Sequence, residues 1–352
     1  MNIKQSTLAA AVTAALAFGA AAPAAAYVYA GAGLTIDNLI VGIGGPGVTV
    51  GVTRFDFNQT AQATLNGVTV ASSATCGGLP GVLNNCTPTI GRMDAAAVNA
   101  PGSVPARTNN QMTGGEFTFI GPAASGNYSN ADTQIVTAEL VNLGSPTNTH
   151  NIAESLLNTG TDASANSQIQ SITGFTISFT ISGGPAGFTL NFDADPDLIA
   201  QIMGEAPGGS FSAQANLNAS ITLQQNSATL GGPLGFANWN PQGTAVNDCI
   251  GVNVSCTEDL GGDTQDLNTN VGTTANNTTA TNAMYDPNVL NAATLTHFGL
   301  TVTGLTAGAW TLTLNEAKSD QLARSVPEPG MLALMGIGLM GLVAAGRRRK
   351  LV

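Results

Sequence analysis

Alternation of apolar residues with small or polar ones is the dominant pattern along this chain. It is regular over residues 47–57, 64–70, 175–181, 188–192, 210–223, 298–302 and 310–314. A period of two residues predicts strands with one buried face. Asn66-Gly67 divides the run at 64–70 and predicts a tight hairpin turn, because both residues tolerate positive φ.

Glycine-rich segments separate two further pairs of alternating runs. They predict two more hairpins, at residues 175–192 and 298–314. Polar stretches rich in Asn, Thr and Gly, at 72–110 and 226–291, are expected to be long loops. The body is therefore expected to be all-β, an antiparallel β-sandwich or jelly-roll-like fold with long polar loops. One large β-domain or two smaller ones both fit its length.

Helical signals are sparse. Residues 132–143 fit a helix or a strand, and residues 151–157 fit one or two helical turns. Residues 195–204 predict a helix, because Asp195 can cap it and Pro196 suits the first turn.

The amino-terminal end has the layout of a secretory signal peptide. Lys4 precedes the apolar stretch 8–22, and Ala24 and Ala26 form a small-residue cleavage site before Tyr27. Residues 1–26 are therefore predicted to be a helical signal peptide that is exported by the Sec translocon and removed by signal peptidase. The mature body is predicted to be residues 27–325.

The carboxyl end, residues 326–352, has three parts. The first part is a short motif, Val326, Pro327, Glu328 and Pro329. An apolar run at 330–346 follows it, and the third part is a basic end, Arg347, Arg348, Arg349 and Lys350. The apolar run would span about 25 Å as a transmembrane helix, and the basic end would stay on the cytoplasmic side. The prolines disfavour helix at the residues before them, so the motif should be extended and accessible. A plain anchor that is never processed is the alternative.

This tail resembles the PEP-CTERM sorting signal of Gram-negative bacteria. The resemblance covers about 25 of 352 residues. It implies that exosortase, a membrane-embedded cysteine transpeptidase-like enzyme, recognises Glu328 and its neighbouring prolines. It also implies an exported protein, transiently anchored in the membrane and then at the cell surface or outside it, in bacteria that make exopolysaccharide and biofilm. Residues 192–196 and the strand-rich end of the body resemble exosortase-dependent surface proteins.

The body is strongly acidic. Between Tyr27 and Ser325 it has five basic and twenty acidic residues, and no Lys or Arg occurs between Thr108 and Ala317. Such a chain cannot neutralise phosphates, which excludes nucleic-acid binding, and anionic lipid head groups would repel it. The composition suits an extracellular protein that attracts cations or stays dispersed among polysaccharides.

The four cysteines form two local pairs. Outside the cytoplasm, thiols oxidise, so we expect the disulfides Cys76–Cys86 and Cys249–Cys256. Each closes a short loop and would stabilise the fold by about 2.5 kcal/mol in the chain-entropy model. A zinc site is the rival, but the usual spacing of its cysteines is absent, and other pairings remain formally open.

Two acidic segments are candidates for Ca²⁺. Asp193, Asp195 and Asp197 stand at alternate positions, but the calcium-loop pattern has glycine where Leu198 stands; an acidic helix start is the alternative. Residues 258–266 form a second acidic, glycine-bearing stretch, for which a solvated loop is the alternative. No other cofactor is expected.

Catalytic patterns are absent from the sequence. His150 and His297 are its only histidines, and it has no nucleophile elbow, phosphate-binding loop or zinc helix. We therefore expect no enzyme, although a glycosidase built from two distant carboxylates stays open. Trp310 alternates with apolar residues and should lie in the core, whereas Trp239 stands in a predicted loop and is the better candidate for glycan contact.

Three functions follow in order. The first is a noncatalytic surface or matrix protein that associates with exopolysaccharide, with lateral association through edge strands that few charges protect. The second is a carbohydrate-binding or adhesive module. The third is a secreted hydrolase.

Overall fold

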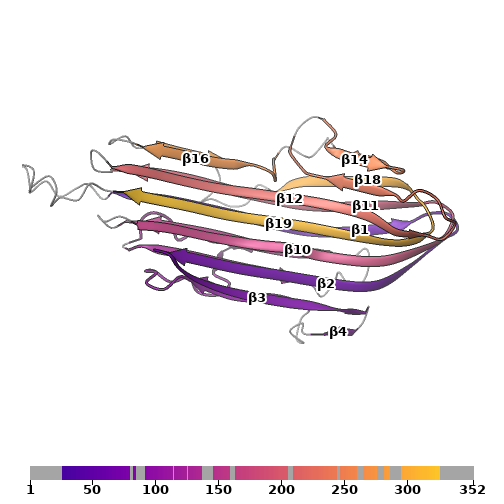
Figure 1. Ribbon diagram of the computed structural model, residues 1–352, viewed down its shortest axis with the longest axis horizontal. Coiled ribbons are helices and arrows are strands. Elements are labelled where there is room, and N and C mark those ends of the chain that lie inside the picture. The colour runs from indigo at the N-terminus through magenta and orange to yellow at the C-terminus, as the bar shows by residue number, and fades with distance from the viewer. Residues whose placement is uncertain are drawn as a thin grey trace, which may run out of the picture.

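The computed structural model describes twelve segments of the chain. They are residues 26–79, 82–84, 92–113, 115–124, 126–136, 146–158, 163–204, 209–243, 246–259, 265–275, 281–285 and 295–325. The signal peptide up to residue 25 and the whole tail, 326–352, lie outside them. In the described segments the regular secondary structure consists of strands, without a helix, and all strand pairs are antiparallel (Figure 1). The predicted all-β antiparallel fold is thus confirmed.

Two large sheets make up the body. Sheet 1 has the order β15 (Ser255–Glu258), β18 (Thr296–Leu305), β11 (Ala186–Met203), β1 (Tyr27–Gly44), β9 (Thr147–Leu157), β8 (Tyr128–Val136), β5 (Arg92–Asn99), and β17 (Thr281–Tyr285) also pairs with β11. Sheet 2 has the order β14 (Cys249–Val252), β13 (Phe236–Trp239), β12 (Ser210–Ala228), β19 (Gly308–Ser325), β10 (Ala163–Gly183), β2 (Val48–Leu65), β3 (Val68–Leu79), β4 (Val82–Asn84), and β16 (Asn270–Ala275) also pairs with β12. A small ribbon joins β6 (Met112–Thr113) to β7 (Glu116–Phe117).

The two sheets pack face to face around one core. On β12 the inward positions from Phe211 to Leu223 are apolar and the outward positions are Ser, Gln, Asn and Thr, as the alternation in the sequence predicted. One part of the core is aromatic and includes Phe179, Phe188, Phe192, Phe298 and Trp310. Further along the strands it is filled by small side chains, among them Ala30, Ala61, Ala200, Ala213 and Ala215.

Several pairs of consecutive long strands cross from one sheet to the other. The connections β1–β2, β10–β11 and β18–β19 lie together at one end of the sandwich, on the right in Figure 1. The two predicted hairpins at 175–192 and 298–314 are therefore wrong, because their strands lie in different sheets. The alternation in the sequence shows which face of a strand is buried, but it does not show which strand is its hydrogen-bonded neighbour. Here the apolar face of each of these strands packs against the opposite sheet. The Asn66-Gly67 hairpin is confirmed: Leu65 pairs with Val68, and both turn residues have positive φ.

The predicted helix at 195–204 is also wrong. These residues continue strand β11, which pairs along its length with β1. Pro196 lies where β11 passes from β18 to β17 as its other neighbour, a position that tolerates a missing N–H. Capping signals are local, and pairing with a central strand overrides them.

Other local predictions are corrected in the same way. Residues 151–157 belong to β9 rather than to helical turns, and the described part of 132–143 belongs to β8. The two predicted long loops contain strands β3–β5 and β13–β17. Short edge strands such as these carry too few residues for their alternation to stand out.

Both ends of the described body lie at the same end of the sandwich. Strand β1 starts at Tyr27 and β19 ends at Ser325, and each runs to or from a crossing connection at the opposite end. The segments predicted to be processed therefore leave the fold at one end.

Gly308 should be intolerant of a side chain. It starts β19 with φ 145°, and a Cβ there would collide with the backbone oxygen of Ser227. We expect Gly308→Ala to lower the free energy of unfolding by about 2 kcal/mol or more, measured by urea denaturation. Gly232 has open space and no positive φ, so Gly232→Ala should change stability by less than about 0.5 kcal/mol. If the two variants lowered the free energy of unfolding equally, the close approach of Gly308 to Ser227 at the start of β19 would be contradicted.

Candidate functional site

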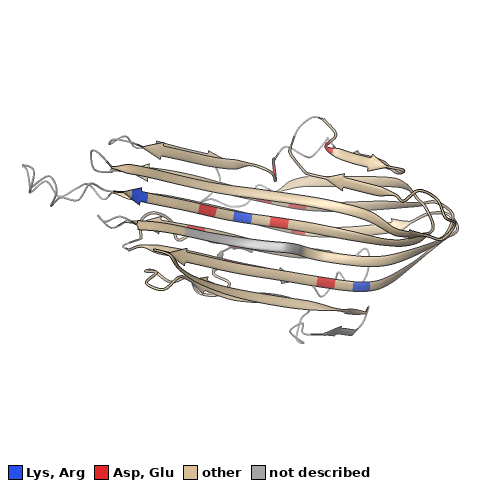
Figure 2. Cartoon of the chain, viewed as in Figure 1, with Lys and Arg blue, Asp and Glu red and all other residues tan. Residues whose placement is uncertain are grey.

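A row of charged side chains lies inside the sandwich. On β19 the inward positions after Leu314 are Glu316, Lys318, Asp320, Leu322 and Arg324, and all are buried. Figure 2 shows the alternating acidic and basic positions on this strand, while neighbouring strands carry few charges. Every second residue of β19 faces the core, and Trp310 and Leu312 belong to this set. Continuing the same alternation beyond Leu314 in the sequence would have predicted that the charged side chains also face the core.

Glu316 is the centre of this buried polar group. Its Oε2 lies 2.6 Å from Nζ of Lys318 and accepts a hydrogen bond of 2.9 Å from Nδ2 of Asn151, on β9 of the facing sheet. The Thr133 hydroxyl donates to Oδ1 of the same Asn151. Burial lowers the pKa of Lys318, and the Glu316 carboxylate acts in the opposite direction. None of these residues was among the site residues predicted from the sequence.

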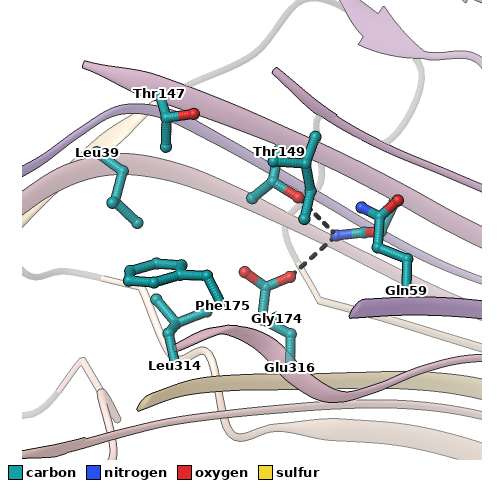
Figure 3. Close-up of a pocket in the computed structure, with 10 residues that line it drawn as sticks. Leu39, Gln59, Thr147, Thr149, Gly174, Phe175, Leu314 and Glu316 are labelled. Carbon is teal, nitrogen blue, oxygen red and sulfur yellow. Dashed lines mark hydrogen bonds between the residues drawn. The ribbon is translucent and has the colours of Figure 1, made fainter. Parts of the chain in front are cut away.

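A small cavity adjoins Asn151 and Glu316 (Figure 3). Its volume is about 20 Å³, and its apolar side is formed by Leu39, Phe175 and Leu314. On its polar side, neither amide atom of Gln59 nor Oε1 of Glu316 has a hydrogen-bond partner among the described residues. The space fits a molecule the size of water, and it is far too small for a sugar.

Glu154 holds a second buried polar group, on the outward face of sheet 1. Its carboxylate accepts hydrogen bonds from the hydroxyls of Tyr29 and Tyr128, from Arg107 at 3.0 Å, and from the backbone of Ile120 and Gly121. Burial and the Glu154 charge raise the pKa of both tyrosines. The five donors satisfy the buried carboxylate and fasten the segment before β8 across the sheet, so this group is structural.

Asp132, on β8, lies on the same outward face of sheet 1 as Glu154 and is fully buried. Its Oδ2 accepts a 2.8 Å hydrogen bond from the backbone of Asn110, and its Oδ1 has no partner among the described residues. Burial raises the pKa of Asp132 to about 7, although the Asn110 amide and the nearby Arg107 charge act to lower it. Asp94 adds to the upward shift.

The three candidate calcium ligands lie on β11. Asp193, Asp195 and Asp197 share the outward face of this strand, where alternate residues are about 6.6 Å apart. Asp193 accepts a hydrogen bond from Nδ2 of Asn38 and lies 3.0 Å from Nδ1 of His297. Within the described residues, no three His, Cys, Asp or Glu side chains converge as a metal site would require. The acidic helix start is wrong, because the segment is a strand, whereas Ca²⁺ binding stays a prediction. The second candidate, 258–266, lies partly outside the described residues.

The two histidines lie on different strands of sheet 1, with β11 and β1 between them. His150, on β9, is buried, packs edge-on against Phe117 and lies 3.9 Å from Asp37. His297, on β18, is half exposed beside Asp193. Both histidines therefore pair with carboxylates on the sheet surface.

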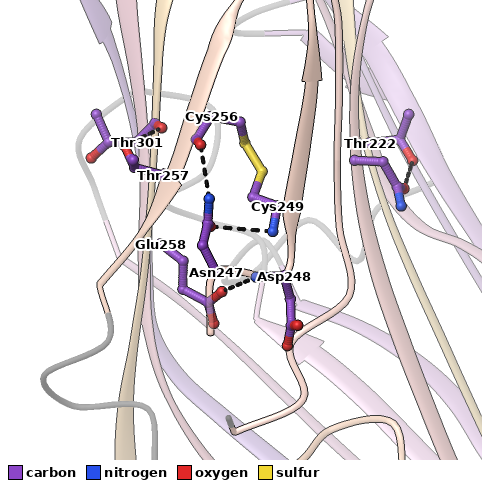
Figure 4. The surroundings of a disulfide bond; sticks show 9 residues. Thr222, Asn247, Asp248, Cys249, Cys256, Thr257, Glu258 and Thr301 are labelled. Atoms are coloured by element: carbon purple, nitrogen blue, oxygen red, sulfur yellow. Dashed lines mark hydrogen bonds between the residues drawn. A yellow bond between two sulfur atoms is a disulfide. The ribbon is translucent and has the colours of Figure 1, made fainter. Parts of the chain in front are cut away.

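A disulfide links Cys249 to Cys256, with 5.6 Å between the Cα atoms (Figure 4). Cys249 lies on β14 of sheet 2 and Cys256 on β15 of sheet 1, so the bond joins the edges of the two sheets. Asn247 bridges it by accepting from the Cys249 backbone and donating to the Cys256 carbonyl. Cys76 is buried at the end of β3, and its predicted partner Cys86 lies outside the described residues.

The two tryptophans are both in the core. Trp310 is buried, as predicted. Trp239 is 0% exposed and packs against Phe192 with 5.9 Å between the rings, so its predicted glycan contact is wrong. It belongs to β13, a strand of four residues that alternate in burial, within the stretch predicted to be a loop.

A polar groove lies on the outward side of sheet 2. Ser212, Gln214 and Gln321 line it together with Gly272–Thr274 of β16, and its volume is about 200 Å³. No charged residue lines it. Hydroxyl and amide groups that face solvent in this way can exchange hydrogen bonds with an uncharged polar ligand.

Asp132 should make stability depend on pH. Its folded-state pKa is raised from 3.8 to about 7, so between these values the folded protein retains a proton that the unfolded chain releases. Its stabilising contribution is complete below about pH 4 and is lost as the pH rises to about 7, by at most about 1.4 kcal/mol per pH unit. Asp132→Asn should therefore be more stable than wild type at pH 8, with the difference shrinking towards pH 4, in urea denaturation at several pH values. A difference that is constant with pH would contradict the buried-carboxyl assignment.

The comparisons with known proteins concern the tail. No curated protein and no solved structure matches the chain. Among the described residues no helix is long and apolar enough to cross a membrane, and the predicted transmembrane helix lies outside them. Residues 325–350 match the family model of the PEP-CTERM protein-sorting motif. The chain therefore carries a PEP-CTERM sorting motif at its carboxyl end, which supports an exosortase-dependent sorting signal.

Proposed function

We propose that this protein is an exported, noncatalytic component of the cell surface or extracellular matrix, and that exosortase processes its tail. The sorting motif at 325–350 is the observation that carries the proposal. It begins at the last residue of β19, so recognition and cleavage would leave every strand of the body in place. Signal peptidase would act at the same end of the sandwich, before Tyr27.

The surface of the body supports an extracellular role. The outward positions of β12 and β19 are dominated by Ser, Thr, Asn and Gln, and Figure 2 shows few charges on sheet 2 apart from the inward row of β19. Of the basic residues whose side chains are described, Arg107, Lys318 and Arg324 are buried and only Arg54 is exposed. Such a surface is compatible with polysaccharides and repels phosphate polymers, so we propose exopolysaccharide as the surrounding partner.

A carbohydrate-binding module is the second candidate. The groove between β12 and β16 favours it, because hydroxyl and amide side chains without charge suit the hydroxyls of a neutral glycan. In this version the protein would bind a defined sugar chain rather than simply disperse among such chains. In neither version is a cofactor or a catalytic centre proposed.

Fractionation of cells that make tagged variants tests the sorting proposal. The intact protein should be found at the surface or in the medium without its tail, whereas deletion of 326–352 should release the body directly. Glu328→Gln keeps the hydrophobic run and the basic end, so it should accumulate uncut in the inner membrane if the motif is recognised. Equal distribution and processing of all three forms would refute the role of the motif.

A glycan array with the purified body then separates the two candidates. Specific binding that Gln321→Ala and Thr273→Ala abolish would identify the groove as a carbohydrate site. Binding that is equal for the two variants and wild type would refute that location.

A further inference from the structure

An amine, an amide and a carboxylate meet in the buried interior between the sheets. Oε2 of Glu316 contacts both Nζ of Lys318, at 2.6 Å, and Nδ2 of Asn151, at 2.9 Å. One carboxylate oxygen therefore lies next to the nitrogen that could attack the amide and the nitrogen that would leave it. All three side chains are buried, and Lys318 and Glu316 come from sheet 2 while Asn151 comes from sheet 1.

We propose that Lys318 and Asn151 condense to an isopeptide bond, with Glu316 as the group that transfers the protons. The arrangement has each part that such a reaction needs. The amine is held beside a carboxylate that can accept its proton. The amide carbonyl is polarised by the Thr133 hydroxyl, which donates to Oδ1 of Asn151. Water competes little, because the site is enclosed.

The reaction begins with a proton shift. Nζ gives a proton to Glu316, which leaves a neutral amine and a neutral acid. Burial favours this form, as the lowered pKa of Lys318 indicates. The lone pair of Nζ then attacks Cγ of Asn151, and the π electrons of the carbonyl move to Oδ1, where the Thr133 hydroxyl stabilises the charge.

Collapse of the intermediate breaks the Cγ–Nδ2 bond. Glu316 gives its proton to Nδ2, which leaves as ammonia, and then takes the second proton from Nζ. An amine and a carboxamide thus become a secondary amide and ammonia, without any redox step or cofactor. Glu316 ends as a neutral acid, so a buried ion pair with its desolvation cost is replaced by uncharged groups.

The cavity beside Asn151 and Glu316 provides room for the product. Asn151 and Glu316 both line it, and its volume of about 20 Å³ accommodates a molecule the size of ammonia. Gln59, whose amide atoms have no partner among the described residues, also lines the cavity and offers hydrogen bonds to such a molecule. The bond itself would tie β9 of sheet 1 to β19 of sheet 2.

Intact-mass spectrometry of the purified, reduced protein tests the proposal. The folded chain should be lighter than its sequence mass by one ammonia, about 17 Da. After proteolysis that cuts the chain between Asn151 and Lys318, the two peptides that contain these residues should be recovered as one cross-linked species. In denaturing electrophoresis the closed loop should migrate faster than an uncross-linked chain.

Variants assign the roles. Glu316→Gln should abolish the mass loss, and Lys318→Arg, which keeps the positive charge, should also abolish it. Asn151→Asp should lose water instead of ammonia and yield the same cross-linked mass as wild type, which keeps the test valid if Glu316→Gln does not fold. Glu258→Gln, the same substitution on edge strand β15, should retain the full loss. A folded wild-type chain of unmodified mass, or an unchanged loss in Lys318→Arg, would overturn the proposal.

Discussion

The separation of inward and outward side chains on very long strands is the constraint on which this structure depends. Strands such as β10, β11, β12 and β19 span the whole sandwich, so a single register decides the burial of many residues at once. Because of the crossing connections, strands that follow one another in the sequence lie in opposite sheets and pack across the core, instead of pairing side by side. Any residue at an inward position is thereby committed to the interior, whatever its charge.

The charges of β19 show this commitment. Glu316, Lys318 and Asp320 occupy inward positions that Leu314 and Leu322 continue on either side. Their burial is tolerable because they meet one another and polar residues of β9: Asn151 contacts Glu316, and Ser155 donates to Asp320. The same rule operates outside the core, where Glu154 is buried by the covering segment and is satisfied by five donors.

Much of the strand content and the sorting tail could be predicted from the sequence, because both rest on local patterns. The partners of each strand could not, since alternation is the same whether a strand pairs with its neighbour or crosses to the other sheet. Asp195 and Pro196 imitate a helix start, yet pairing of β11 with β1 decides their conformation. The burial of Trp239 could not be predicted, because β13 has only four residues and so short a strand shows no clear alternation. The contact of Asn151 with Glu316 joins residues far apart in the chain, so it can be identified only from the three-dimensional structure.

The position of the two ends of the described body has a consequence for how the protein meets its surroundings. Tyr27 and Ser325 share one end, and the three crossing connections form the other, about 60 Å away for strands of 18 residues. In the membrane-anchored form that we propose, the connections at 45–47, 184–185 and 306–307 lie at the end of the body farthest from the point where the tail is attached. They consist of Gly, Pro, Thr and Ala. In that form, the end of the body that faces away from the membrane would be formed by connections without charge.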